Sequence, residues 1–360
     1  MSLLRSIAES LKEDARNVAT TPVESYRDAR HTLREVRAGR VSPLEPLKTL
    51  GLTLGALVVV LALLFPIYWI LISALSGTGG SIYSSNGLRL LPQEPSLQPF
   101  LWVVGDLIVP SYRIGLGIPF SNSALVFNTP ELVFLDVSNY GVTDPSEFKH
   151  FLWNSMWVAV PTVILSMCLI VPASYALSRR EFIGREKILF GYVLMTQVGS
   201  GLGIALLIAL YAAYVQVGLN NNKLALSVYY AATAVPFNTW LLKTYMDGIP
   251  VSYEEAAIVD GAPPWRVVTE VILPLSAAGL ATVFIFTFLT GWTEFVVAQT
   301  LLGTENYTLP VGLFSLVSEY SVPWARFSAF ALTFASPIVL VYLFAQRYIE
   351  GGLSFSGMEG

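Results

Sequence analysis

Long apolar runs, separated by shorter polar stretches, dominate the chain from residue 51 onward. An α-helix needs about 20 apolar residues to cross the hydrocarbon core of a bilayer, and several runs reach that length. Their apolar residues come in unbroken blocks and do not alternate with polar ones, as they would around a water-soluble core. The pattern predicts six transmembrane helices: Gly51 to Leu75, Phe151 to Ser178, Ile188 to Leu219, Leu224 to Leu242, Ser276 to Leu301 and Phe327 to Gln346.

Charge is almost absent from these runs. Five of the six contain no charged residue, and the fifth contains only Glu294. The third run is longer than one crossing needs, so we expect it to tilt or to extend beyond the bilayer. A short polar stretch, Asn220 to Lys223, separates the third run from the fourth. The predicted fold class is therefore all-α, in the form of a polytopic membrane protein with six transmembrane helices.

Composition agrees with a membrane protein and excludes other classes. Of the 360 residues, 54% are hydrophobic and 13% are charged, whereas soluble domains are about 25% charged. The net charge is −4, and no basic patch predicts nucleic acid as a partner. The single cysteine, Cys168, cannot form an intrachain disulfide, and its place in an apolar run predicts a packing role. His31 and His150 lie in different polar regions, which argues against a histidine-based metal site.

The polar regions divide the chain into five parts. Residues 1–49 form a charged arm, in which Leu4, Ile7 and Leu11 have the spacing of a short amphipathic helix. Such a helix would lie on the membrane surface or contact a cytoplasmic partner, and a solvated arm without a role is the alternative. After this arm come the first transmembrane helix (50–75), a long extracytoplasmic insertion (76–150), a five-helix core (151–349) and a C-terminal tail (350–360).

The insertion contains one segment with strand character, Glu131 to Val137. Connections of this length are usually functional or disordered. We therefore consider two interpretations of the insertion, an external docking surface and a simple insertion without a function of its own.

Lysine and arginine fall mainly on one side of the predicted helices. Sixteen of the 21 lie in the arm, in the stretch Arg179 to Lys187, or at Lys243, Arg266 and Arg347. Because cytoplasmic loops carry an excess of these residues, we expect a plasma-membrane protein with both termini in the cytoplasm. About fifty residues, many of them charged, precede the first run, which does not match a secretory signal peptide. That run is therefore expected to remain as a helix.

A polar loop, residues 250–274, interrupts the apolar second half of the chain, and we call it the corner loop. Ser252 followed by Glu255 forms a capping box, which predicts the start of a short helix. Gly261 is expected to end this helix in the left-handed conformation. The proline pair that follows suits the first turn of a second short helix, and Pro274 is expected to end that helix just before the fifth run.

Two interpretations of the corner loop follow from its residues. Two short helices held at a glycine and joined to a membrane helix can transmit motion. Ala256 and Ala257 give a narrow face that fits a cleft in a partner, and the neighbouring carboxylates of Glu254, Glu255 and Asp260 suit basic groups on the rim of that cleft. The alternative is an ordinary connection made of two capped helices.

The corner loop resembles a known signature. Glu255-Ala256-Ala257, then Gly261 and, after nine residues, Val271 followed by Leu273-Pro274 are similar to the EAA signature of permease subunits in binding-protein-dependent ABC importers. Val271 stands where that family more often has isoleucine. The chain is similar to the MalG-like permeases of carbohydrate importers over about Phe151 to Gly360, through "ASYALSRREFIGREK", "PFNTWLLKTYMDGIP", "GWTEF", "TLPVGL" and "QRYIEGGLSFSGMEG".

This resemblance implies a type I ABC importer permease fold, in which the corner loop is the coupling helix for a cytoplasmic ATPase. The implied coupling residues are Glu254, Glu255, Ala256, Ala257, Asp260 and Gly261. The implied partners are a second homologous permease subunit, two ATP-binding cassette subunits, an extracytoplasmic sugar-binding protein, a sugar and membrane lipid. The insertion and the arm look longer than is usual in this family.

The chain itself is not expected to be an enzyme or to bind a cofactor. It contains no G-x-x-x-x-G-K-[ST] sequence, so it lacks the loop that cradles nucleotide phosphates. ATP and magnesium are therefore expected on the partner ATPase.

Four polar residues in the predicted membrane helices are candidates for a translocation path: Gln197, Ser200, Asn238 and Glu294. An ionisable side chain in a membrane helix is costly and generally faces a cavity or a partner. We therefore expect Glu294 to act in a gate or in the path, with a hydrogen bond to another helix as the alternative. The other three offer donors and acceptors for sugar hydroxyls, and bonds between helices are their alternative role.

The sequence thus predicts a permease subunit that moves a sugar, with a disaccharide or oligosaccharide preferred. One alternative is an importer permease for a non-sugar solute such as a polyamine, against which the "TLPVGL" segment and the C-terminal tail argue. Another is an ion-coupled secondary transporter, which usually has paired repeats or several intramembrane charges. A membrane-embedded enzyme is disfavoured because no nucleophile and base, or metal-binding set, is recognisable.

Overall fold

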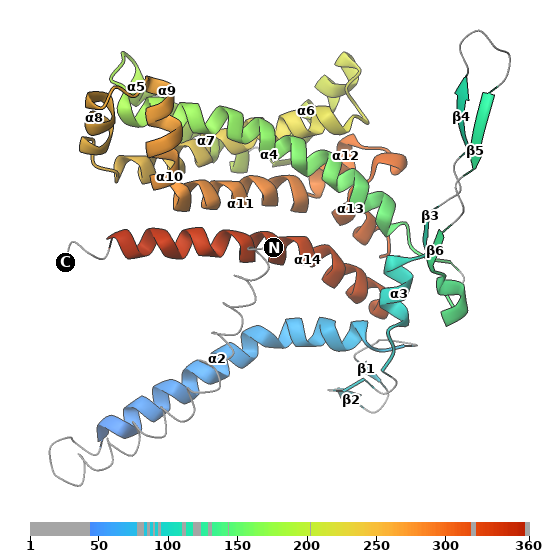
Figure 1. Ribbon diagram of the computed structural model, residues 1–360. Coiled ribbons are helices and arrows are strands. Elements are labelled where there is room, and N and C mark those ends of the chain that lie inside the picture. Colours follow the sequence, from blue (N-terminus) through green and yellow to red (C-terminus); the bar gives the residue numbers. More distant parts are fainter. Residues whose placement is uncertain are drawn as a thin grey trace. The chain divides into compact units, whose positions relative to one another are not determined.

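The computed structural model describes residues 44–77, 83–84, 87–88, 91–92, 95–109, 113–117, 124–128, 132–142, 144–201, 203–317 and 322–356. This part of the chain is predominantly helical (Figure 1). The predicted amphipathic helix at Leu4, Ile7 and Leu11 lies outside the described residues, as do residues 357–360 of the predicted tail.

The chain divides into two compact units, Met1–Trp69 and Ile70–Gly360. The described part of the first unit is most of helix α2, Leu44–Ala74, which contains Pro66. None of the most apolar 18-residue window of α2 is buried. A helix that is apolar all round needs an apolar environment, as the sequence predicts for its first membrane helix.

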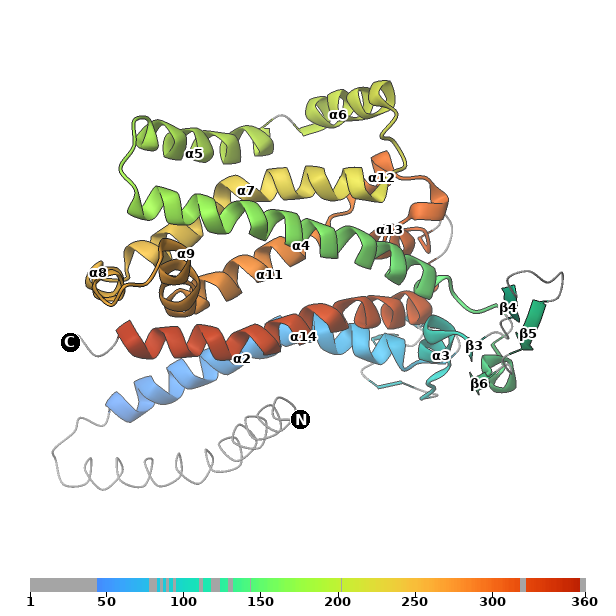
Figure 2. The same ribbon diagram turned by 45° about the horizontal axis from the view of Figure 1, so that its top comes forward.

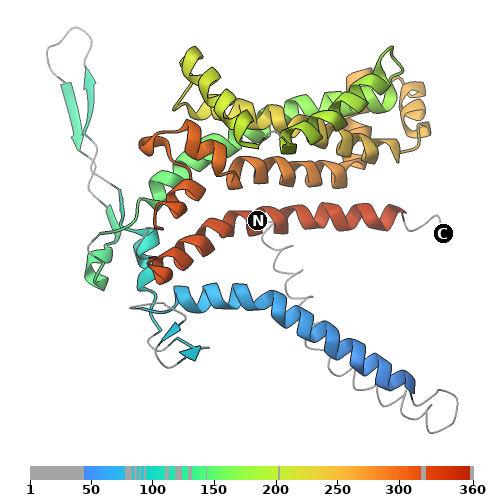
Figure 3. The same ribbon diagram turned by 180° about the vertical axis from the view of Figure 1, so that it is seen from behind.

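Four long helices make up the centre of the second unit: α4 (Phe148–Arg179), α7 (Lys223–Asp247), α11 (Ala277–Thr293) and α14 (Trp324–Ser356). α4, α7 and α11 pack against one another, and α14 lies along α11 (Figure 1). Two further helices, α5 (Arg185–Gly201) and α6 (Gly203–Val217), lie on the side of the bundle away from α14 (Figures 2 and 3).

Small residues let these helices approach closely. A Cβ atom added to Gly291 of α11 would lie 2.9 Å from the Cα atom of Ala159 in α4. One added to Gly279 of α11 would lie 2.6 Å from the ring of Tyr245 in α7. The α4 face that packs here is rich in buried serine and threonine, including Thr162. Contacts of this kind are typical of helix packing in membranes, where small and weakly polar residues replace large apolar ones.

The corner loop lies at one end of this bundle (Figure 1), which we call the α8 end. It contains α8 (Ser252–Val259), α9 (Pro264–Arg266), the π-helical segment η2 (Val267–Ile272) and α10 (Leu273–Leu275). An apolar cluster of Ile170, Leu242, Met246, Ile249, Ile272 and Val283 joins the loop to the long helices.

The opposite end of the bundle, which we call the α3 end, carries α3 (Gln98–Val104), η1 (Val137–Tyr140), α12 (Val296–Leu301), η3 (Thr304–Asn306) and α13 (Leu309–Phe314). Helix α3 packs on α14. The guanidinium of Arg326 lies 5.1 Å from the ring centre of Trp102, a buried residue of α3. The Asp106 carboxylate accepts a hydrogen bond of 2.8 Å from the Val137 amide. This bond joins the segment that follows α3 to the start of η1.

The insertion also contains strands, which the all-α prediction does not include. They form three antiparallel pairs: β1 (Tyr83–Ser84) with β2 (Gly87–Leu88), β3 (Leu107–Val109) with β6 (Leu132–Leu135), and β4 (Arg113–Gly117) with β5 (Ala124–Asn128). Strand β6 confirms strand character over Leu132–Leu135 of the predicted segment Glu131 to Val137, whereas Val137 begins η1.

The predicted count of six membrane helices is not confirmed. By length and composition, three helices of the described chain can each cross a membrane, α2, α4 and α14, and a fourth span results if α9–α10 and α11 count as one bent helix. The third run breaks near Gly203, which has a φ of +44°, and the fifth run breaks at Glu294. The fourth run becomes α7, whose buried polar residues reduce its apolar character.

Two smaller expectations also change. Cys168 is exposed on the surface of α4, so it does not have the predicted packing role within this chain. Helix α14 continues to Ser356, so most of the predicted tail at 350–360 is helical.

Candidate functional site

Helix α8 begins without the predicted capping box. Its N-cap is Val251, and no side chain caps it. The amide of Glu254 donates to the Val251 carbonyl at 2.9 Å and that of Tyr253 to the Pro250 carbonyl at 3.3 Å. Because the chain already turns at Pro250, Ser252 lies inside the first turn. The capping-box prediction is therefore wrong, although the helix it predicted is present.

The end of α8 agrees with the sequence. Gly261 has a φ of +83°. Its amide donates to the Ile258 carbonyl at 3.0 Å, and the Ala262 amide donates to the Ala257 carbonyl at 2.9 Å. These two bonds are the Schellman motif, which requires a left-handed residue that is usually glycine. The predicted glycine corner is confirmed.

The second half of the corner loop leads directly into α11. Pro264 occupies the first turn of α9, as predicted for one proline of the pair. The helical path continues through η2 and ends at Leu275, one residue after Pro274. α11 then departs at an angle of 81° to it. The buried hydroxyl of Ser276 donates to the Ile272 carbonyl at 2.8 Å and so stabilises the bend.

The corner loop presents an exposed apolar surface, which we call the loop tip and define as Tyr253, Ile258, Val259 and Trp265. Val259 is 86% exposed and Trp265 is 63% exposed. Glu255, Ala256 and Asp260 are also exposed. Exposed apolar surface bordered by carboxylates is typical of a site for protein interaction. The loop tip therefore suits the cleft-filling role predicted for this segment.

Glu254 differs from its neighbours because it points into the chain. It is the one buried residue of α8. Its carboxylate forms an ion pair of 2.5 Å with Nε of Arg179, and both side chains are 9% exposed. The hydroxyl of Tyr175 donates to its other oxygen at 3.4 Å. Glu254 was predicted to meet basic groups on a partner, and this geometry corrects that prediction, because its charge is already paired inside the chain.

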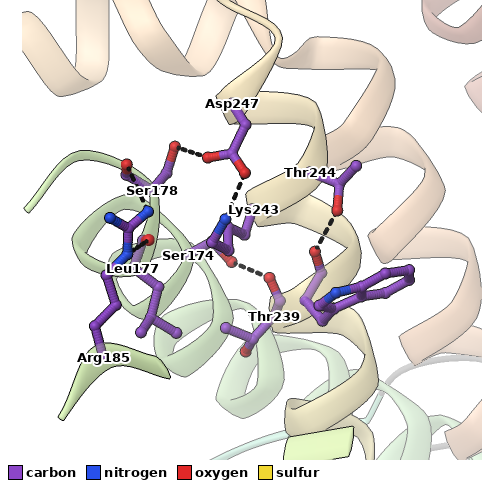
Figure 4. Close-up of polar contacts among 9 residues, drawn as sticks. Ser174, Leu177, Ser178, Arg185, Thr239, Lys243, Thr244 and Asp247 are labelled. Atoms are coloured by element: carbon purple, nitrogen blue, oxygen red, sulfur yellow. Dashed lines mark hydrogen bonds and ion pairs between the residues drawn. The ribbon is translucent and has the colours of Figure 1, made fainter. Parts of the chain in front are cut away.

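Polar contacts connect the last turns of α4 and α7 beside this ion pair (Figure 4). The hydroxyl of Ser178 donates to the Asp247 carboxylate at 2.6 Å, and Lys243 donates to the other oxygen of that carboxylate. Arg185, at the start of α5, donates from Nε to the Leu177 carbonyl at 2.8 Å. Farther from the end, the Ser174 hydroxyl donates to the Thr239 carbonyl at 3.0 Å. These polar contacts thus join α4, α5 and α7 at the α8 end of the bundle.

Glu294 lies in the break between α11 and α12. Its carboxylate accepts hydrogen bonds from the amides of Val297 at 3.0 Å and Ala298 at 3.2 Å. The buried hydroxyl of Tyr230, on α7, also donates to it. The structure therefore agrees with the alternative interpretation, in which Glu294 forms a hydrogen bond to another helix. A role in a gate or path stays a prediction.

The other path candidates are not brought together with Glu294 by any contact in the described chain. Asn238 is buried, its amide nitrogen donates to the Ala234 carbonyl at 2.8 Å, and its side-chain oxygen has no partner among the described residues. Gln197 and Ser200 lie on α5, and their side chains are outside the described part. In that part no three histidine, cysteine, aspartate or glutamate side chains gather as a metal site.

A polar network at the α3 end has no counterpart in the sequence prediction. Asn221 has a φ of +57°. Its side-chain oxygen accepts from the Gly303 amide at 2.7 Å, and its nitrogen donates to the Glu305 carboxylate at 2.7 Å. Asn154 of α4 donates to the Glu305 carbonyl and accepts from Lys223 at 2.8 Å. In the sequence, the run of asparagines before α7 is the feature that indicates a special conformation here, because asparagine tolerates the left-handed backbone that Asn221 adopts.

Comparison with known proteins identifies the family. Residues 151–354 match the family described as "Binding-protein-dependent transport system inner membrane component". The chain belongs to this family. The predicted resemblance to ABC importer permeases is thereby confirmed, and so is the prediction of a membrane protein with several membrane helices.

Curated relatives include permeases of named sugar systems. The maltose/maltodextrin transport system permease protein MalG of Vibrio vulnificus (strain YJ016) is 32% identical over 83% of this chain and 91% of that protein. MalG of Yersinia pestis is 36% identical over 60% of this chain and 72% of that protein. The inner membrane ABC transporter permease protein YcjP of Escherichia coli (strain K12) is 27% identical over 87% of this chain and 98% of that protein.

A solved structure confirms the fold of this family member. The chain resembles one chain of a bacterial ABC transporter involved in the import of the acidic polysaccharide alginate, with a TM-score of 0.63 and 20% identity. The match covers 86% of this chain and 98% of that one. The predominantly helical permease fold predicted from the sequence is therefore correct.

Proposed function

We propose that this chain is the permease subunit of an ATP-driven importer for a sugar, preferably a disaccharide or oligosaccharide. The observation that carries the proposal is the corner loop, in which a glycine-capped helix presents an apolar tip to a partner and continues through a fixed bend into α11. The maltose and alginate systems among the similar proteins support a sugar over a polyamine as the solute.

The partner at the corner loop is a cytoplasmic ATPase. The loop tip fills a cleft of that protein, while the exposed carboxylates of Glu255 and Asp260 pair with basic groups on the rim of the cleft. The small side chain of Ala256 lets the partner approach α8 closely, and Gly261 fixes the direction in which the chain continues after α8. Aromatic residues that become buried at the centre of an interface often contribute most of the binding energy, and Trp265 is suited to this role.

The excess of lysine and arginine supports a cytoplasmic location for the α8 end and for both termini. The α3 end then faces the extracytoplasmic binding protein, which delivers the sugar. A second homologous permease subunit completes the membrane part, and membrane lipid surrounds both. ATP and magnesium bind to a pair of ATPase subunits, and this chain performs no covalent chemistry.

The translocation path of this proposal includes Glu294, Asn238, Gln197 and Ser200. The side-chain oxygen of Asn238 has no partner within the described chain, and a buried acceptor of this kind is stabilised when a hydroxyl reaches it. Glu294 lies between two helices at a break in α11 and α12, so motion of either helix changes its surroundings.

The test compares two strongly exposed apolar residues at the α8 end of the bundle. Val259→Asp places a charge on the loop tip, and Ile183→Asp places one on the α4–α5 connection, where Ile183 is fully exposed. We expect Val259→Asp to abolish co-purification of the ATPase and uptake of labelled maltose, trehalose and maltotriose, while Ile183→Asp retains co-purification. Retention of the ATPase by Val259→Asp would contradict docking at the loop tip.

A further inference from the structure

A buried charge fastens α8 to the rest of the chain. The buried face of a surface helix is usually an apolar stripe. In α8 the one buried residue is Glu254, while Ala257 is half-buried and the other residues are exposed. The contact of α8 with the long helices therefore depends on a carboxylate and on the groups that surround it.

Those groups belong to the last two turns of α4. Arg179 forms the ion pair with Glu254 through Nε, and it donates from Nη2 to the Ile249 carbonyl at 2.7 Å. Tyr175, one turn earlier, donates to the second oxygen of Glu254. The planar guanidinium can bind two acceptors at once in a fixed geometry. One side chain of α4 therefore holds both the start of α8 and the segment that connects α7 to it.

This contact is a polar connection from the corner loop to the helices. It adds to the covalent path through η2 and α10 into α11 and to the apolar cluster around Ile272. It passes through Arg179 into α4, which packs along α7 and α11. Two charges in a nearly dry site strongly resist separation, because each would remain buried without compensation. A displacement of α8 is thus expected to carry the end of α4 with it.

We propose that Arg179 is the positioning residue through which α8 and α4 move as one unit during transport. The proposal rests on the docking of an ATPase at the loop tip. It assigns different tasks to adjacent residues of like charge. Glu254 and Arg179 fasten the loop to α4, whereas Glu255 and Arg180 are exposed and are not needed for that connection.

The test uses the assembled importer in proteoliposomes, with ATP hydrolysis and uptake of the labelled sugar measured on the same preparation. The variants are Arg179→Gln, Glu254→Gln and the exchanged pair Arg179→Glu with Glu254→Arg, and Arg180→Gln is the matched control. A Val259→Cys substitution, in a Cys168→Ser background, reports docking through a cross-link to the ATPase.

We expect the cross-link and basal ATP hydrolysis to persist in all variants. Sugar transported per ATP hydrolysed should fall about tenfold in Arg179→Gln and in Glu254→Gln, the range expected for loss of a coupling contact. The exchanged pair should recover much of that loss, and Arg180→Gln should match the unsubstituted chain. Because transport per ATP is measured on importers that form the cross-link and hydrolyse ATP, a loss of folded chain alone does not change it.

Arg179→Lys covers the case in which Arg179→Gln does not assemble. Lysine keeps the charge but lacks the planar fork, so transport per ATP should be intermediate in an assembled importer. Unchanged transport per ATP in Arg179→Lys and Glu254→Gln would overturn the proposal, and so would an exchanged pair no better than the single variants. Absence of the cross-link in the otherwise unsubstituted chain would instead overturn the docking on which the proposal rests.

Discussion

The glycine corner allows a prediction whose magnitude follows from the backbone. Gly261 has a φ of +83°, and a Cβ atom added there meets no atom within 4 Å. The penalty for Gly261→Ala is therefore conformational and not steric, and an L-residue in this region costs about 1–2 kcal/mol. A local free-energy change of this size lowers the population of the capped corner roughly 5- to 30-fold relative to its opened form.

We expect Gly261→Ala to lower sugar uptake and to speed hydrogen exchange at the amides of Gly261 and Ala262, whose bonds close the corner. Gly261→Asn should be milder, because asparagine tolerates the left-handed region. Gly261→Asp should leave the subunit inserted in the membrane but uncouple uptake from ATP hydrolysis, since it adds a charge beside Asp260.

The chain offers a matched control for the backbone strain that a substitution of Gly261 introduces. Gly184, in the α4–α5 connection, has a φ of +95° and open space around a Cβ atom. Gly184→Ala therefore imposes a similar backbone penalty outside the corner loop, and uptake should remain near normal. Normal uptake and unchanged exchange in Gly261→Ala would refute the reasoning, as would equal damage from Gly184→Ala.

Two other predictions concern the long helices. Gly291→Ala should lower the thermal stability of the detergent-solubilised chain, because its Cβ atom would press on the backbone of α4 at 2.9 Å and overpacking costs about 1–3 kcal/mol. Gly191→Ala is the control, since a Cβ atom there meets nothing within 4 Å, and it should leave the melting temperature unchanged. Equal melting temperatures for the two variants would contradict the prediction. Glu294→Ala and Glu294→Gln should both lower uptake while the ATPase still co-purifies. Normal uptake by Glu294→Gln, which keeps an acceptor for the Val297 amide, would return Glu294 to a structural role.

The sequence by itself determined the features that depend on neighbours along the chain. Apolar runs without charge predicted α4, α7 and α14, because a long apolar helix is specified by its own composition. The glycine and proline residues of the corner loop predicted the end of α8, the left-handed corner and the start of α9, because each restricts the backbone at its own position.

Only the tertiary structure decided which polar side chain meets which. Glu254 and Glu255 are adjacent and chemically alike, and the turn at Pro250 directs the first toward Arg179 of α4 and leaves the second exposed. Likewise, Glu294 reaches Tyr230, and Asn221 reaches Gly303, across helices that are distant in sequence. Local patterns fix backbone conformation, but the partner of a buried charge depends on how the helices pack, and no local pattern contains that information.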